Sequence, residues 1–182
     1  MNQYPNAAAG LRLMFIGQIL TIVGTLLIWV PLVGSLIVIA GTLVGLVGIY
    51  KAGADDENYR GALVFAAANL VVGIISGFVG EGILSSLLDV VSTVLNLLVV
   101  YTVCNTTSNL LHSVGNETLA QRGQTVIKIY MICSVVAIVC QILAVVPILN
   151  IIAALVSVIA AIVLVVGYVM YLLFLSGSSK AL

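Results

Sequence analysis

Three long apolar stretches constrain what this chain can fold into more than any other feature. They cover residues 11–50, 61–103 and 124–176. A single helix of about 40 residues would be about 60 Å long, twice the roughly 30 Å of hydrocarbon in a bilayer. Each stretch must therefore turn back on itself once. The helix-breaking residues predict these turns near Pro31, at 80–82 and near Pro147.

The predicted fold class is all-α. We expect a single domain over residues 1–182, a polytopic membrane bundle of six transmembrane helices arranged as three hairpins. A membrane β-barrel would instead show alternating segments of about ten residues, whereas these apolar runs are continuous. The predicted helices cover about 11–30, 32–50, 61–79, 83–103, 124–146 and 148–175.

The composition supports a membrane location. Of the 182 residues, 63% are hydrophobic and only 7% are charged, whereas soluble domains carry about 25% charged residues. A water-soluble fold with so few charges would expose large apolar patches and aggregate. We therefore expect lipid to surround most of the chain.

The basic residues all fall on one side of the predicted arrangement. With six spans, that side holds both termini and the segments 51–60 and 104–123, and the other side holds only the three turns. Cytoplasmic loops of membrane proteins are enriched in Lys and Arg. We therefore expect both termini in the cytoplasm and, from the compact loops, a bacterial plasma membrane. The basic residues are Arg12, Lys51, Arg60, Arg122, Lys128 and Lys180.

Charge and motif content exclude several classes of function. A net charge of zero offers no basic surface for nucleic acid. Cys104, Cys133 and Cys140 have neither metal-binding nor redox spacing. Neither a nucleophile motif nor a phosphate-binding glycine loop occurs. The sequence thus predicts that the chain is not an enzyme and holds no metal or cofactor.

One ionisable residue lies clearly inside a predicted span. Asp89 is about six residues into the fourth helix, roughly 9 Å below the outer boundary. A charged side chain within a bilayer is costly and indicates a functional site by default. Polar residues at three- and four-residue spacing form a stripe with it along the helix. The stripe comprises Ser85, Ser86, Asp89, Ser92, Thr93 and Asn96.

Polar residues of other helices could complete a site around Asp89. Gln141 lies near the outer end of the fifth helix, Asn150 begins the sixth, and Gln18 and Asn69 lie nearer mid-membrane. If they converge, a polar cavity forms with Asp89 at its centre. The alternative is structural, because such side chains also hold bundles together at about 0.6 kcal/mol each. The candidate ligand- or ion-binding residues are Asp89, Ser85, Ser92, Asn96, Gln141 and Asn150.

Small residues predict close helix packing in the first half of the chain. They recur at three- and four-residue spacing on three helices, a pattern that permits close approach of backbones. They are Gly17, Thr21 and Gly24 on the first helix, Gly41, Gly45 and Gly48 on the second, and Ala66, Asn69, Gly73, Gly77 and Gly80 on the third.

The predicted cytoplasmic segments hold most of the remaining polar residues. We interpret the acids at 55–57 as an exposed turn and not as a cation site. In segment 104–123 the apolar residues Leu110, Leu111, Val114 and Leu119 are spaced for a short helix lying on the membrane. His112 is expected to be solvated there.

Two classes of function remain open. In the first, the polar stripe lines a cavity in which the protein binds or transports a small solute, a cation or a proton, with Asp89 as the charged contact. In the second, the protein is a non-transporting scaffold or accessory subunit. It then docks a membrane or cytoplasmic partner protein through segment 104–123. In both, the lipid bilayer is the main contact, and nucleic acid is not a partner.

Overall fold

The computed structural model describes residues 3–27, 29–30, 32–79, 82–144 and 150–182, with side chains except at 144, 150–155 and 157. Every regular element in these ranges is an α-helix. The six helices are α1 (Pro5–Leu26), α2 (Val33–Ala52), α3 (Asn58–Phe78), α4 (Ile83–Ser113), α5 (Glu117–Ala144) and α6 (Asn150–Ala181). Each contains a segment long and apolar enough to cross a membrane. The all-helical prediction with six candidate spans is confirmed, whereas the predicted turn residues Pro31, Gly80, Glu81 and Pro147 lie outside the described residues.

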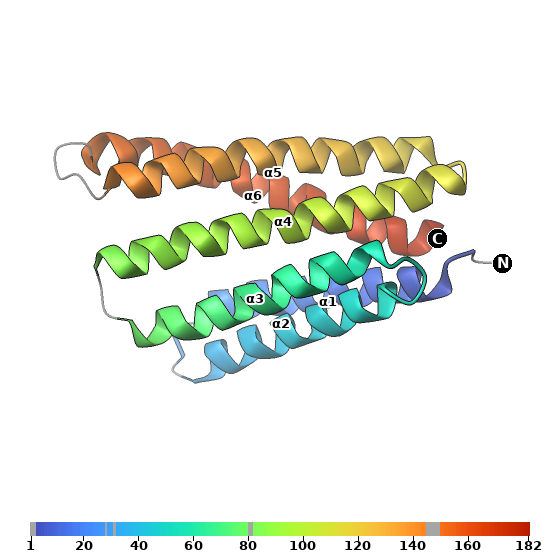
Figure 1. Ribbon diagram of the computed structural model, residues 1–182, viewed down its shortest axis with the longest axis horizontal. Helices are drawn as coiled ribbons and strands as arrows, with labels where there is room; N and C mark the ends of the chain where they lie inside the picture. The colour runs from blue at the N-terminus through green and yellow to red at the C-terminus, as the bar shows by residue number, and fades with distance from the viewer. Residues whose placement is uncertain (1–2, 28, 31, 80–81, 145–149) are drawn as a thin grey trace.

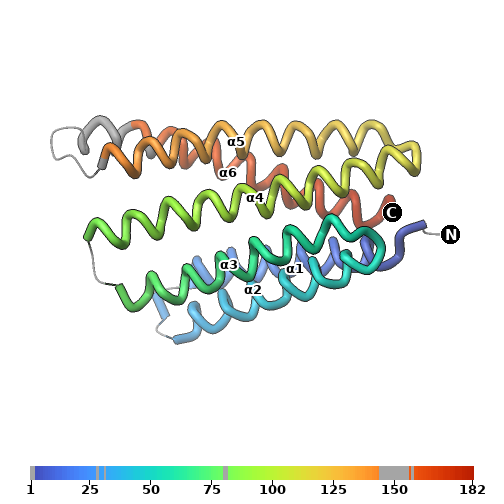
Figure 2. The backbone as a smooth tube through the Cα atoms, viewed as in Figure 1, coloured from blue at the N-terminus to red at the C-terminus, as the bar shows by residue number. Residues whose placement is uncertain are grey.

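The helices lie side by side along one long axis (Figure 1). Both termini lie at one end of the bundle, here the terminal end, with the α2–α3 and α4–α5 turns (Figures 1 and 2). The opposite end is the distal end. Each helix from α1 to α5 contacts the next one along the chain, most extensively α1 with α2 and least α2 with α3, and α1 also contacts α6. Because α4 contacts α5 as extensively as it contacts α3, the helices do not divide into three distinct hairpins by their contacts. The three-hairpin arrangement and the cytoplasmic termini therefore stay predictions.

The helices continue beyond the predicted spans at the terminal end. Helix α4 runs to Ser113 instead of 103, α5 begins at Glu117 instead of 124, and α1 begins at Pro5 instead of 11. Hydrophobicity locates only the part of a helix that lies in hydrocarbon. The additional turns of α4 and α5 are largely polar and those of α1 are rich in alanine, and capping interactions rather than long apolar runs decide where the helices begin and end.

A carboxylate from the α2–α3 turn caps the first turn of α1. One oxygen of Asp55 accepts a hydrogen bond from the Asn6 side-chain amide, and the other accepts from the Ala7 backbone N–H, both at 2.7 Å. The first N–H groups of a helix lack partners within it and carry partial positive charge. Asp55 therefore fixes the start of α1 and ties it to a turn 48 residues away in sequence.

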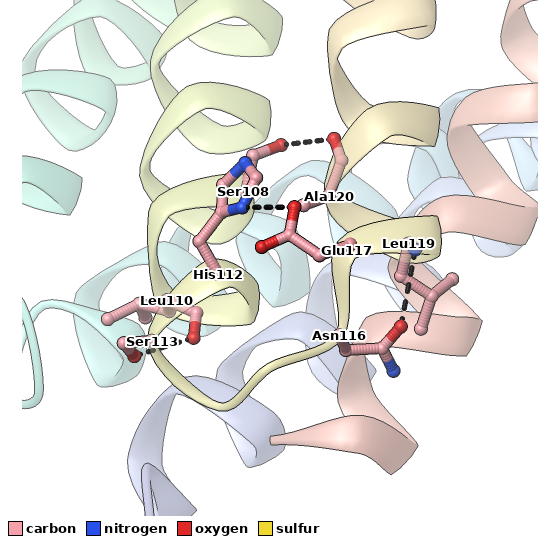
Figure 3. Close-up of polar contacts among 8 residues, drawn as sticks. All are labelled: Ser108, Leu110, His112, Ser113, Asn116, Glu117, Leu119 and Ala120. Atoms are coloured by element: carbon pink, nitrogen blue, oxygen red, sulfur yellow. Dashed lines mark hydrogen bonds and ion pairs between the residues drawn. The ribbon is translucent and has the colours of Figure 1, made fainter.

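The α4–α5 turn is compact (Figure 3). Gly115 takes a left-handed φ of +78°, and its N–H bonds the His112 carbonyl at 3.0 Å. The next N–H, of Asn116, reaches the Leu111 carbonyl at 2.8 Å, which completes a Schellman motif. The Asn116 side chain then caps α5 by accepting from the Leu119 N–H at 3.3 Å. These features join the two helices through only three residues, 114–116.

The predicted membrane-surface helix in segment 104–123 is therefore wrong. Leu110 and Leu111 lie on the last turns of α4 and are buried in the bundle, Leu111 completely. Ser108 links the two helices by donating to the Ala120 carbonyl at 3.1 Å. His112 is also not merely solvated, because its Nδ1 lies 2.7 Å from the Glu117 carboxylate (Figure 3). An apolar repeat predicts which residues are buried, but it does not predict whether they are buried in lipid or against other helices.

The hydrophobic core lies at the terminal end. Helix α3 buries only Tyr59 and Ala62, in its first turns, and α4 buries residues only from Val100 onward. Tyr59 donates or accepts a hydrogen bond with Thr107 at 2.7 Å within this core. Helices α1 and α6 lie together at the terminal end and apart at the distal end (Figures 1 and 2). The distal halves of α3 and α4 thus pack less tightly than their terminal halves.

Glycines join α1 and α2 backbone to backbone. A Cβ added at Gly17 would lie 2.6 Å from the carbonyl oxygen of Gly41, far closer than atoms tolerate. The same steric conflict pairs Gly10 with Gly48 and Gly24 with Gly34, at 2.5 and 2.8 Å. Both glycine series recur every seven residues and run in opposite directions, which keeps one side of each helix against its partner. The predicted close packing is confirmed for these two helices.

The glycines of α3 do not pack in this way. No described atom lies within 4 Å of a Cβ built on Gly73 or Gly77, and the same is true of Gly45 in α2. The prediction that the small residues of α3 pack closely on another helix is therefore wrong for these positions. They leave space between α3 and the α1–α2 pair instead.

Candidate polar cavity between the helices

A cavity of about 750 Å³ occupies this space, between the α1–α2 pair on one side and α3 and α4 on the other. Met14, Ile49 and Tyr171 line it and also belong to the core at the terminal end. Ser35 and Gly77 line it nearer the distal end of their helices. The cavity therefore extends from the core along the loosely packed half of the bundle.

The lining of the cavity combines apolar side chains with amides and hydroxyls. Among the described residues that line it, none is charged. A polar lining at this depth in a membrane bundle needs partners, because an unpaired polar group in hydrocarbon is costly. The polar lining residues are Gln18, Thr21, Ser35, Thr42, Asn69, Ser92, Asn96 and Tyr171.

Two of the predicted site residues lie in this lining. Ser92 donates a hydrogen bond to the Asn69 amide oxygen at 2.7 Å, which holds α4 on α3. Asn96 follows one turn later, is exposed, and forms no hydrogen bond with another described residue. On the opposite wall, the Tyr168 hydroxyl donates to the side-chain oxygen of Gln18. Asn69 and Gln18 are thus held in place, whereas the Asn96 amide stays open to a ligand.

Asp89 lies outside the lining of the cavity. Its side chain is exposed, and its backbone carbonyl accepts a hydrogen bond from Thr93 at 2.8 Å. Asp89 precedes Asn96 by seven residues on α4, so it lies on the same side of the helix about 10 Å nearer the distal end. The structure therefore places the predicted central acid beyond the cavity and not at its centre.

Of the other three predicted site residues, Ser85 and Gln141 do not line the cavity. Ser85 caps α4 by accepting from the Gly82 N–H at 3.3 Å and donating to the Gly82 carbonyl at 2.9 Å. Gln141 donates to Thr93 at 3.2 Å and so joins α5 to α4, while its buried amide oxygen has no partner among the described residues. Asn150 begins α6, and its side chain lies outside the described residues.

Sequence reasoning missed the contribution of α2. Its glycines Gly34, Gly41 and Gly48 face α1, and the residues that follow each of them, Ser35, Thr42 and Ile49, line the cavity. Residues one position apart on a helix lie about 100° apart around its axis. The sequence signal that could have predicted this is a glycine every seven residues on α2, each followed by the residue that lines the cavity.

Within the described ranges, no group of three His, Cys, Asp or Glu side chains is placed to hold a metal ion. Comparisons with protein families, with curated proteins and with solved structures gave no match. The fold itself defines the class. Throughout the described residues the chain is helical, with six helices long and apolar enough to cross a membrane, as in a multi-pass integral membrane protein. A partly open cavity with amides and hydroxyls in its lining lies between these helices.

Proposed function

We propose that this protein binds a small, uncharged polar solute in the cavity and carries it across the membrane. The observation that carries the proposal is the position of three amide side chains, Gln18, Asn69 and Asn96, around one cavity. Asn69 lies at the middle of α3, which is roughly 15 Å from either end of that helix. Groups at that depth can replace the water that a polar solute loses on entering a membrane.

The size and chemistry of the cavity support a small molecule. Ligand cavities are typically about 300–1,000 Å³ and combine an apolar lining with a few placed polar groups. A side-chain amide offers two N–H donors and a carbonyl acceptor, and Asn96 uses none of them on another described residue. A neutral lining favours an uncharged solute, because an ion would lose hydration without meeting an opposite charge.

Water access to Asn96 tests whether the cavity is open. The three native cysteines are buried and should not react with a polar reagent, so the labelling of a single introduced cysteine can be measured. In intact cells, Asn96→Cys should react with a membrane-impermeant thiosulfonate. The matched control is Val94→Cys, two residues away on α4, which is exposed but does not line the cavity and should stay unreactive because it faces lipid. Failure of Asn96→Cys to react from either side of the membrane would overturn the proposal.

A solute screen tests what the cavity holds. Glycerol, urea, a hexose and a neutral amino acid amide can each be added during labelling of Asn96→Cys. A bound solute should slow the reaction, and the same solute should enter proteoliposomes. Double replacement of Asn69 and Asn96 by Leu should then lower uptake at least tenfold, which corresponds to about 1.4 kcal/mol. If none of these solutes protects or enters, an uncharged solute is the wrong class.

Asp89 distinguishes this proposal from cation or proton transport. For an uncharged solute, Asp89→Asn should leave uptake in proteoliposomes unchanged, because the carboxylate does not line the cavity. Loss of uptake in Asp89→Asn, with protein that still purifies as a monodisperse species, would instead favour coupling to a cation or a proton. The same variant thus decides between the two forms of the transport hypothesis.

A scaffold role is the second candidate, and the length of α4 favours it. The helix has 31 residues and is about 46 Å long, more than the roughly 30 Å of hydrocarbon. Its last turns and the start of α5 can therefore project from the membrane. Deleting the last turns of α4 and the start of α5 would remove the buried Leu111 and could unfold the protein. Substitution of exposed residues is therefore the better test. Replacing the exposed pair Gln121 and Arg122 by Glu should release a co-purifying partner, whereas Lys180→Glu should not.

A further inference from the structure

A second cavity lies at the terminal end, between the last turns of α2 and the first turns of α3. Its volume is about 660 Å³. Both charged residues in its described lining are basic, Lys51 from α2 and Arg60 from α3. The remainder of the lining is mainly apolar, apart from the Tyr50 ring and backbone of the turn. Its lining shares only Ile49 with the described lining of the polar cavity, and the proposed transport does not use it.

The two helices present the same order of side chains to this cavity. On α2, Val47 precedes Lys51 by one turn, and on α3, Val64 follows Arg60 by one turn. Each helix therefore places a cation at its end and an apolar side chain about 6 Å deeper on the same side. Both valines are exposed, 56% and 65% respectively. Such an order matches the head group and the first part of an acyl chain of a phospholipid.

The nearby acidic side chains are directed to other partners. Asp55 accepts the two hydrogen bonds at the start of α1, and Asp56 accepts from the Asn58 N–H at 2.9 Å. Glu57 lies 3.3 Å from one terminal nitrogen of Arg60, in a pair that is mostly exposed. Exposed pairs of this kind are weak, and a guanidinium has further N–H donors for a phosphate. None of these acids lines the cavity.

The turn positions the Arg60 side chain beside α2. A Cβ built on Gly53 would lie 3.7 Å from Cγ of Arg60, so the aliphatic stem of the arginine lies over the end of α2. Among the described residues, Lys51 forms no ion pair. One cation is thus held over the turn and the other is available to a ligand.

We infer that this cavity binds an anionic phospholipid, with the phosphate between Lys51 and Arg60 and an acyl chain along Val47, Leu63 and Val64. Basic pockets between transmembrane helices are suited to anionic head groups. Arg binds phosphate through two parallel N–H groups of its planar guanidinium, and Lys binds it as a compact charge. The bound lipid would lie in the leaflet on the terminal side of the membrane. It would join the end of α2 to the start of α3.

Lipid binding to the purified protein tests this inference. Dioleoyl phosphatidylglycerol, dioleoyl phosphatidylcholine and inorganic phosphate can each be titrated into protein in a neutral maltoside detergent, with binding followed by native mass spectrometry. Phosphatidylglycerol should bind, and replacing Lys51 and Arg60 together by Gln should weaken it roughly thirtyfold. The double variant Arg122→Gln with Lys128→Gln removes the same charge elsewhere and should bind normally. Glu57→Gln should bind more tightly, because it frees Arg60.

Each other outcome would overturn the inference. If phosphatidylcholine binds as tightly as phosphatidylglycerol, the cavity does not recognise the charge of the head group. If inorganic phosphate binds as tightly as phosphatidylglycerol, the cavity binds an anion and does not bind a lipid specifically. Equal loss in both double variants would show that net charge alone matters. Lys51→Arg with Arg60→Lys keeps both charges and should restore binding. If it does not, although the protein is monodisperse, the cations do not form the site.

Discussion

Single polar side chains at the terminal end satisfy backbone groups that the helices leave open. Asp55 caps α1 from another part of the chain, and Asn116 caps α5 locally. In the core, Tyr59 and Thr107 satisfy each other's hydroxyls at 2.7 Å. None of these residues touches the polar cavity. They stabilise the terminal end of the bundle, and this stability allows the rest of the bundle to contain the polar cavity without unfolding.

Removal of the Asp55 carboxylate should destabilise this end. In Asp55→Ala, the Ala7 N–H and the Asn6 amide lose their acceptor, at a cost of about 1–2 kcal/mol. Thermal unfolding in detergent and amide exchange of the first turn of α1 would measure it. Glu57→Gln removes an acid two residues away whose pair with Arg60 is mostly exposed, and it should change stability little. Equal effects of the two substitutions would contradict the capping role.

The sequence predicted residue types better than residue roles. The spacing of Ser92 and Asn96 places them on one helix face, and they line the cavity. Ser85 has the same spacing but lies at the start of α4, where a hydroxyl bonds the backbone instead. A charge in a membrane is costly, which made Asp89 the expected centre of a site, but the structure leaves it exposed and outside the cavity lining. Spacing defines a face, but only packing decides which part of that face is enclosed.

At the scale of helices, glycine has two opposite uses in this protein. On α1 and α2 it allows backbone contact, and on α3 it leaves space. The sequence showed both sets as the same pattern of small residues. They differ only in whether a partner helix lies opposite, and that depends on contacts between distant parts of the chain.

Alanine substitution should separate the two uses. Gly17→Ala places a Cβ 2.6 Å from the Gly41 carbonyl, which should separate α1 from α2 and cost about 1–3 kcal/mol. Gly73→Ala meets no described atom within 4 Å and should be neutral, or stabilising by up to about 1 kcal/mol through helix propensity. Unfolding of both variants in detergent would compare them. A destabilised Gly73→Ala would mean that α3 packs on a neighbour in the membrane.

At the scale of the whole molecule, sidedness remains a prediction from the distribution of cations. The α2–α3 and α4–α5 turns lie at the same end of the bundle (Figure 1). Asn58→Cys and Thr118→Cys should therefore be labelled from one compartment, the cytoplasm, and Gly82→Cys from the other. All three positions are exposed at or beside helix ends. Labelling of Asn58→Cys and Thr118→Cys from opposite compartments would exclude six spans.

The apolar sequence by itself determined that the described part of this chain is helical, that its helices number six there, and that each is long and apolar enough to cross a membrane. The reason is that hydrocarbon offers no partner to a backbone group, so every long apolar run must form its own hydrogen bonds. Only the tertiary structure decided where the bundle closes and where it leaves a cavity. In lipid, contacts between helices depend on shape, which the pattern of apolar residues does not encode.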